Sequence, residues 1–89
     1  MTFEWDEGKN QDNNFKHNIS FEEAQYAFFD KNRIIYKDER HSLVKERFFC
    51  IGKIDDRIIT VRFTMRNQNI RIFGAGYWRE GRKLYEKRD

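Results

Sequence analysis

Three arginines in the second half of the chain, Arg62, Arg66 and Arg71, are spaced so that they could hold a phosphate group. Arginine suits phosphate because its planar guanidinium donates two parallel, charge-assisted hydrogen bonds. On a rigid sheet such groups could also stabilise the extra charge of a pentacovalent phosphorus transition state. The structural alternative is that they are solvated strand residues, paired with Asp or Glu across the sheet. Spacing alone leaves both interpretations open.

Small and aromatic residues follow these arginines in the run 74–79, which reads GAGYWR. Small residues let a backbone or a ligand approach closely, and the rings of Tyr77 and Trp78 offer surfaces on which an unpaired base can stack. Tyr77 or Tyr85 could also transfer a proton, although a phenol with its ordinary pKa of about 10 is poorly matched to neutral pH. The alternative is that Tyr77 and Trp78 are hydrophobic plugs against a C-terminal helix.

The two histidines, His17 and His41, are the natural candidates for general acid–base chemistry, because histidine titrates near neutral pH without help. Both fall in predicted loops, where a capping or surface hydrogen bond is the alternative role. No pair of histidines has a spacing typical of metal ligands, and the phosphate-loop, dinucleotide-binding and nucleophile-elbow motifs are absent. The sequence therefore predicts no metal or other cofactor. The neighbours Glu46 and Arg47 could form an ion pair that orients another group, and the favoured alternative is a structural role.

Charge is distributed unevenly along the 89 residues. The net charge is +3, but residues 1–56 carry nine Lys/Arg against twelve Asp/Glu, and residues 57–89 carry nine against three. A basic half is the expected footprint of a nucleic-acid site, since Lys and Arg neutralise phosphates. An acidic protein partner would fit the same asymmetry.

The length and composition predict a single globular domain over residues 1–89. Cys50 is the only cysteine, which excludes an internal disulfide, and its apolar neighbours predict a buried strand thiol. No apolar run is long enough for a membrane span and no signal peptide is recognisable, so we expect a cytoplasmic protein without membrane contact.

Two helices are expected in the first third of the chain. Asp6 is a plausible N-cap for a polar helix over 7–16, although that segment has almost no apolar face. Ser20 and Glu23 form a capping box that starts a helix over 21–29. The apolar residues of the second helix recur at helical spacing, so they form one stripe that packs in the core.

Four strands follow, over 33–37, 47–53, 57–66 and 70–74, with turns at 55–56 and 67–69. In the third strand Ile59, Val61, Phe63 and Met65 point to one face, while Thr60, Arg62, Thr64 and Arg66 point to the other. In the fourth strand Ile70 and Ile72 oppose Arg71 and Phe73. The pattern predicts an antiparallel sheet with one face on helices and one polar, basic face. A basic helix over 79–88 completes an α+β fold.

The order of these segments and the residues within them resemble those of the BrnT family of type II toxins. The similarity covers nearly all of the chain and keeps the spacing. The matching residues are Phe3-Glu4-Trp5-Asp6, Lys9, Asn14, Lys16-His17, Ile19-Ser20-Phe21-Glu22-Glu23-Ala24, Phe29-Asp30, Asp38, His41-Ser42, Glu46-Arg47-Phe48, Ile51-Gly52, Thr64, Arg66, Ile70-Arg71-Ile72 and Lys83-Leu84-Tyr85-Glu86.

The resemblance implies a RelE-like fold and a ribonuclease that inhibits translation. It also implies a cognate ribbon-helix-helix antitoxin, through which alone the toxin would reach operator DNA. One departure matters: where many relatives read Ser-Ala-Arg after the last strand, this chain has Gly74-Ala75-Gly76. If the missing Arg contacts phosphate, Arg79 must replace it or activity is reduced.

These observations lead to the hypothesis of a metal-independent endoribonuclease that attacks the phosphate with a ribose 2′-hydroxyl. Arg66, Arg71 and Arg79 would hold the phosphate, and His41 or His17 would transfer protons. Contacts to RNA are expected from Arg62, Tyr77, Trp78 and Tyr85. The alternative is a non-catalytic basic module that binds an acidic antitoxin-like protein or nucleic acid without cutting it.

Overall fold

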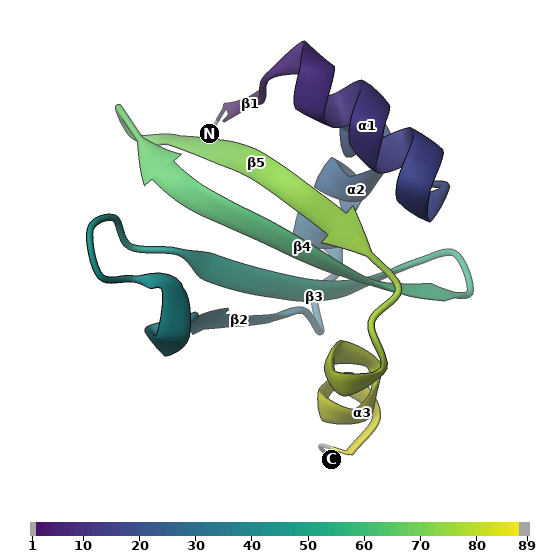
Figure 1. The fold of residues 1–89 in the computed structure, drawn as a ribbon. Helices are drawn as coiled ribbons and strands as arrows, with labels where there is room; N and C mark the ends of the chain where they lie inside the picture. Colours follow the sequence, from purple (N-terminus) through teal and green to yellow (C-terminus); the bar gives the residue numbers. More distant parts are fainter. Residues whose placement is uncertain (1, 88–89) are drawn as a thin grey trace.

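The computed structural model describes residues 2–87, which form a five-stranded sheet with helices on both of its faces (Figure 1). The strands lie in the order β1-β5-β4-β3-β2. Their bounds are β1 Phe3–Glu4, β2 Ile34–Lys37, β3 Phe48–Ile54, β4 Arg57–Arg66 and β5 Asn69–Gly76. The helical segments are α1 Glu7–His17, α2 Phe21–Ala24, η1 Gln25–Phe29, η2 Glu39–His41 and α3 Arg79–Lys87. The α+β class is confirmed, and the last position expected in the C-terminal helix, residue 88, lies outside the described residues.

The prediction of four antiparallel strands was wrong in one respect. The entry segment Phe3–Glu4 is a fifth strand, paired parallel to β5 with Phe3 opposite Ile70 and Glu4 opposite Arg71. The backbone amide of Ile70 also donates to the carbonyl of Thr2, with an N···O distance of 2.9 Å. The sheet is therefore mixed. A two-residue strand has no alternation to read, so its pairing could not be recognised from the sequence.

Helix α1 begins where expected, with the Asp6 carboxylate accepting the backbone N–H of Lys9. This polar helix is held by two buried asparagines instead of an apolar stripe. Asn10 accepts the N–H of Phe21, and Asn13 accepts the N–H of Ala75 while donating to the carbonyl of Ile19. Because buried amides that are fully hydrogen-bonded fix one geometry, α1 is anchored to both α2 and β5.

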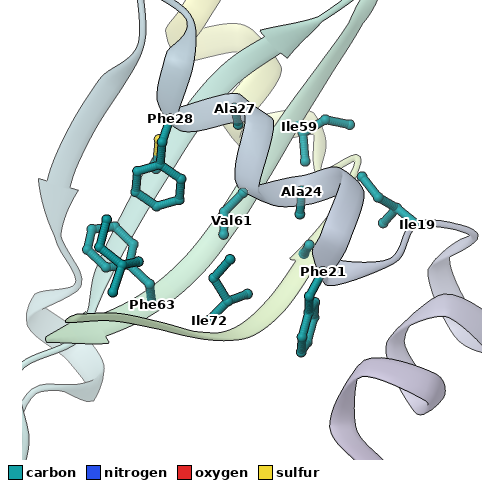
Figure 2. Packing of buried hydrophobic residues seen from close by; sticks show 12 residues of the cluster. Ile19, Phe21, Ala24, Ala27, Phe28, Ile59, Val61, Phe63 and Ile72 are labelled. Atoms are coloured by element: carbon teal, nitrogen blue, oxygen red, sulfur yellow. The ribbon is translucent and has the colours of Figure 1, made fainter. Parts of the chain in front are cut away.

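The capping box at Ser20 is confirmed, since its hydroxyl accepts the N–H of Glu23 and the Glu23 carboxylate accepts the N–H of Ser20. The expected helix over 21–29 is α-helical only as far as Ala24 and continues as the 3₁₀ helix η1. Figure 2 shows its apolar stripe directed at the sheet. The residues that pack together there include Phe21, Ala24, Ala27, Phe28, Ile59, Val61, Phe63 and Ile72.

The strand alternation is confirmed for most positions, and it defines two faces of the sheet. We call the side packed on α2 and η1 the core face and the opposite side the open face. Cys50 is fully buried on the core face, and burial raises the pKa of its thiol to about 12. Met65 was expected in the core but is 42% exposed. It lines an apolar groove of about 480 Å³ that continues the core face past η1, together with Phe3, Phe28, Phe29, Arg33, Ile35, Phe48, Phe63 and Ile70.

Helix α3 packs on the open face, which the sequence had predicted to be free of helices. Gly81 makes this packing possible, because a Cβ at that position would lie 2.0 Å from Thr60 Oγ1 and 3.5 Å from Ile51 Cδ1. Tyr85 anchors the same helix by donating its hydroxyl to the Asp30 carboxylate. Part of the open face is therefore covered, and Ile51 is fully buried there. No helix within residues 2–87 is long and apolar enough to cross a membrane.

Candidate nucleic-acid interface

Two arginines meet on one aromatic ring in the uncovered part of the open face. The guanidinium carbon of Arg47 lies 5.1 Å from the centre of the Phe73 ring, and that of Arg62 lies 5.0 Å from it. Cations at this distance are attracted by the negative face of the ring. The two guanidinium carbons are thus at most 10.1 Å apart, so both groups can contact one short stretch of RNA backbone. No carboxylate pairs with either of them within residues 2–87.

A β-bulge places Phe73 between these arginines. Arg62 pairs with Gly74 and Phe63 pairs with Ile72, so Phe73 is the extra residue of β5. A bulge of this kind re-aims side chains and is common beside functional sites. Gly74 lies against the Arg62 side chain, since a Cβ at this position would be in ordinary van der Waals contact with Arg62 Cδ, at 3.4 Å.

The end of helix α1 forms a basic wall next to this pair. A hollow of about 200 Å³ lies between α1 and the sheet, and its lining includes Arg62, Phe73 and Trp78. The α1 residues that line it are Lys9, Asp12, Asn13, Lys16 and His17. The His17 ring lies 5.8 Å from the Trp78 rings, centre to centre. His17 and Trp78, which the sequence had only proposed separately, are therefore brought together beside Arg62.

His41 is the last residue of η2, in the loop that leads to Arg47. Its Nδ1 lies 2.8 Å from the carboxylate of Asp38, which is itself 7% exposed. The Ser42 hydroxyl donates to the Asp38 carbonyl and accepts the backbone N–H of Arg47. A buried carboxylate that holds one ring nitrogen fixes the orientation of the imidazole. The half-exposed His41 is thus a positioned histidine and not a free loop residue.

Arg71 and Arg66 lie on the open face closer to the β4–β5 turn. Arg71 forms an ion pair with Glu4 of β1 at 2.8 Å, and Asn69 donates to the same carboxylate. These hydrogen bonds, above all the one from Arg71, hold the pKa of Glu4 below its ordinary value of 4.5. Arg71 therefore has the structural partner that the sequence left as an alternative, whereas Arg66 is exposed beside the turn.

The remaining residues predicted for the site do not join this group. Arg79 is the first residue of α3 and follows the C-terminal end of β5. Arg66 and Arg71 lie at the opposite end of β5, near the β4–β5 turn. Tyr77 accepts a hydrogen bond from Arg57 at the start of β4, and Tyr85 is the anchor of α3 described above.

Sequence reasoning missed three contributors: Arg47, Phe73 and Asp38. The Glu46–Arg47 ion pair that the sequence left open does not form, because Glu46 pairs with Lys37 at 3.1 Å and leaves Arg47 for the Phe73 ring. Strand alternation could have found Arg47, since it lies two residues before Phe49 and shares its face. Nothing in the sequence marked the bulge that places Phe73. Within residues 2–87 no group of three or more His, Cys, Asp or Glu side chains is arranged to hold a metal ion.

Comparison with protein families decides what kind of protein carries this site. Residues 5–81 match the family model described as "Ribonuclease toxin, BrnT, of type II toxin-antitoxin system". The chain belongs to the BrnT family. Membership in this family implies an antitoxin partner and a nuclease activity in general. A search among curated proteins found no match to the chain.

Gly76, the last residue of β5, lies against Trp78. A Cβ on Gly76 would lie 3.2 Å from two atoms of the indole ring, Cη2 and Cζ2. Trp78 therefore occupies the space next to position 76 on the open face, between α1 and α3.

Proposed function

We propose that this BrnT-family chain is an endoribonuclease that needs no metal ion and cuts RNA through the 2′-hydroxyl of the ribose. The observation that carries the proposal is the pair of guanidinium groups, Arg47 and Arg62, on the ring of Phe73. Arg62 lies on strand β4, Arg47 directly precedes β3, and both lack a carboxylate partner in the described part of the chain. Preorganised cations of this kind stabilise the charge that develops on a phosphate during displacement.

We assign the proton transfers to the two histidines, since His17 lines the same hollow as Arg62 and His41 is held by Asp38 in the loop that leads to Arg47. His41, held by Asp38, accepts the proton of the 2′-hydroxyl as its oxygen bonds to phosphorus. His17, beside Trp78, donates a proton to the 5′-oxygen as the bond from phosphorus to that oxygen breaks. The products are a 2′,3′-cyclic phosphate and a free 5′-hydroxyl. Arg66 and Arg71 contact neighbouring phosphates, and Trp78 stacks on a base.

The family match implies an antitoxin partner and supports a proposed biological setting. In this proposal RNA cleavage in the cytoplasm inhibits translation, and a cognate ribbon-helix-helix antitoxin restrains the toxin and carries it to operator DNA. A basic and aromatic site on one face of the sheet agrees with the RelE-like arrangement that the family resemblance implies.

The first test is cleavage of a defined single-stranded RNA by the purified chain with excess EDTA, beside a DNA copy. We expect cleavage of RNA alone, and a loss of about 10²–10³-fold in kcat for Arg62→Ala. Arg82→Ala is the matched control, because Arg82 lies on α3 and pairs with Glu86. If neither the RNA nor ribosome-bound mRNA is cut while the chain still binds RNA, the non-catalytic module is the correct function.

A modified substrate separates the two histidines. An RNA with sulfur in place of the 5′-bridging oxygen has a leaving group that departs without protonation. His17→Ala should cut this substrate nearly as fast as the unsubstituted chain does, whereas His41→Ala should stay slow on both substrates. The opposite pattern would exchange the two roles, and slow cleavage by both variants would remove His17 as the acid.

A further inference from the structure

A second hollow, of about 320 Å³, lies on the open face between strands β2 and β3 and the start of α3. Tyr36 and Phe49 stack on each other in its wall, with ring centres 5.0 Å apart and an angle of 23° between the planes. Trp78 lines this hollow and also the one beside Arg62, so the two adjoin at its ring. We call this second hollow the base pocket; its lining is Tyr36, Phe49, Thr60, Trp78, Arg79, Glu80 and Gly81.

The polar groups of the base pocket are without partners. Neither Glu80 nor Arg79 forms a hydrogen bond or ion pair with another residue of the described range 2–87. The buried hydroxyl of Thr60 also lacks a hydrogen-bond partner within that range. Glu80 lines the same hollow as Tyr36, and burial, then the nearby charges of Glu80 and Asp38, raise the pKa of the Tyr36 phenol. Aromatic walls with unpaired donors and acceptors are typical of a site for a flat, polar ligand.

We propose that the base pocket binds an unpaired guanine of the RNA substrate. Unpaired bases in RNA are recognised by stacking on aromatic side chains and by hydrogen bonds to their Watson–Crick edges. On that edge guanine presents two adjacent donors, N1–H and the 2-amino group, and one acceptor, O6. The Glu80 carboxylate accepts from both donors, and the Arg79 guanidinium donates to O6.

The other bases do not match a carboxylate in the same way. Adenine and cytosine place a ring-nitrogen acceptor next to their amino group, and uracil places carbonyl oxygens on both sides of its single N–H. Each would bring a lone pair against the negative charge of Glu80. The position of the pocket is also suitable, because Trp78 separates it from Arg62. A backbone held by Arg62 can therefore direct a neighbouring base into the pocket.

The guanine site rests on the proposed function, since it assumes that RNA lies on the open face. It is tested by the binding of labelled 2′-O-methyl hexanucleotides, which cannot be cleaved because the attacking hydroxyl is blocked. The probes are hexauridine and the same strand with one G, A, C or inosine. We expect the G-containing strand to bind about 10–100-fold more tightly than the others, as one bidentate contact provides. Inosine, which lacks the 2-amino group, should lose most of that preference.

Glu80→Gln should remove the preference while leaving the affinity for hexauridine nearly unchanged. Glu86→Gln is the matched control, because Glu86 lies on the same helix but pairs with Arg82 and does not line the pocket. Equal affinity for all strands, or a preference for A or C, would overturn the guanine site while leaving the nuclease proposal intact. Absence of binding to every strand would contradict both, and EDTA-resistant cleavage of a long RNA tests the nuclease by itself.

Discussion

Neighbouring residues of strand β4 lie on opposite faces of the sheet and have different surroundings. Ile59, Val61 and Phe63 are buried on the core face against α2 and η1. On the open face, Arg62 lies over the Phe73 ring and remains partly exposed. Because the side-chain period of a strand is two, one sequence specifies both surfaces at once. We therefore expect substitutions on the core face to change the free energy of unfolding and substitutions on the open face to change the rate of RNA cleavage.

The largest effect is expected for Gly52→Val on the core face. A Cβ at Gly52 would lie 2.2 Å from the carbonyl oxygen of Ala27 and 2.9 Å from its Cα. Since these are backbone atoms, η1 must move away from the sheet, at a cost of about 3–5 kcal/mol. Urea unfolding measures the loss. The control is Gly8→Ala on the exposed side of α1, where the added Cβ would lie 3.2 Å from an oxygen of the Asp6 side chain and the stability should change by less than about 1 kcal/mol. A folded Gly52→Val with an unchanged midpoint would show that η1 does not rest on the sheet there.

A smaller effect, and the sharpest contrast, is expected from the neighbours Val61 and Arg62. Val61→Ala should lower the free energy of unfolding by about 2 kcal/mol, since it removes two buried methyl groups and leaves a small cavity. Its cleavage rate, measured where the protein is folded, should not change. Arg62→Ala should show the reverse pattern, with slow cleavage and a stability within about 0.5 kcal/mol of the unsubstituted chain. A variant that changes both quantities equally would contradict the division between the faces.

A pH-dependent effect is expected where β1 meets the open face. The hydrogen bond from Arg71 holds the pKa of Glu4 below 4.5 in the folded chain. The stability that Glu4 contributes is therefore complete above that value and is lost as the pH falls through the lowered pKa. Glu4→Gln should be less stable than the unsubstituted chain at pH 7, and the difference should close at pH values well below 4.5. Thermal unfolding over this range is the measurement, and a difference that widens in acid would refute the assignment.

The smallest effect is expected for Met65→Lys in the apolar groove. By strand alternation Met65 lies on the core face, but it is 42% exposed because it lines the apolar groove at the end of that face. A lysine there can extend its charged end into water, so the change in stability should be within about 0.5 kcal/mol. Chemical unfolding checks this value. A loss as large as that of Val61→Ala would show that the groove is closed in solution.

Local signals allowed much of the fold to be predicted. The caps at Asp6 and Ser20, the alternation in 57–66 and the polar turns depend on near neighbours in the chain, and the structure confirms them. The short strand at Phe3, the bulge at Phe73 and the packing of α3 on the open face depend on contacts between distant segments. No local pattern encodes such contacts.

The same distinction applies to the candidate site. Residue type identified Arg62, Trp78, His17 and His41 as chemically capable side chains. The contacts of a side chain could not be predicted from its residue type. Arg47, for example, is available to the Phe73 ring because Glu46 forms its ion pair with Lys37. The roles of Arg71 and Tyr85 depend on Glu4 and Asp30, which lie more than fifty positions away in the sequence.

The arrangement of the strands has a consequence for how the molecule behaves at high concentration. The longest strands, β3, β4 and β5, with seven, ten and eight residues, are interior, and the edges are formed by β1 and β2 with two and four residues. Long unpaired edges are templates on which other chains add strands and grow into fibrils, and short edges limit this growth. Here β4 is paired with a strand on each side, whereas β1 pairs with β5 only at Ile70 and Arg71 and the side chain of Asn13 on α1 accepts the N–H of Ala75. The folded chain therefore offers other copies little backbone on which aggregation can start.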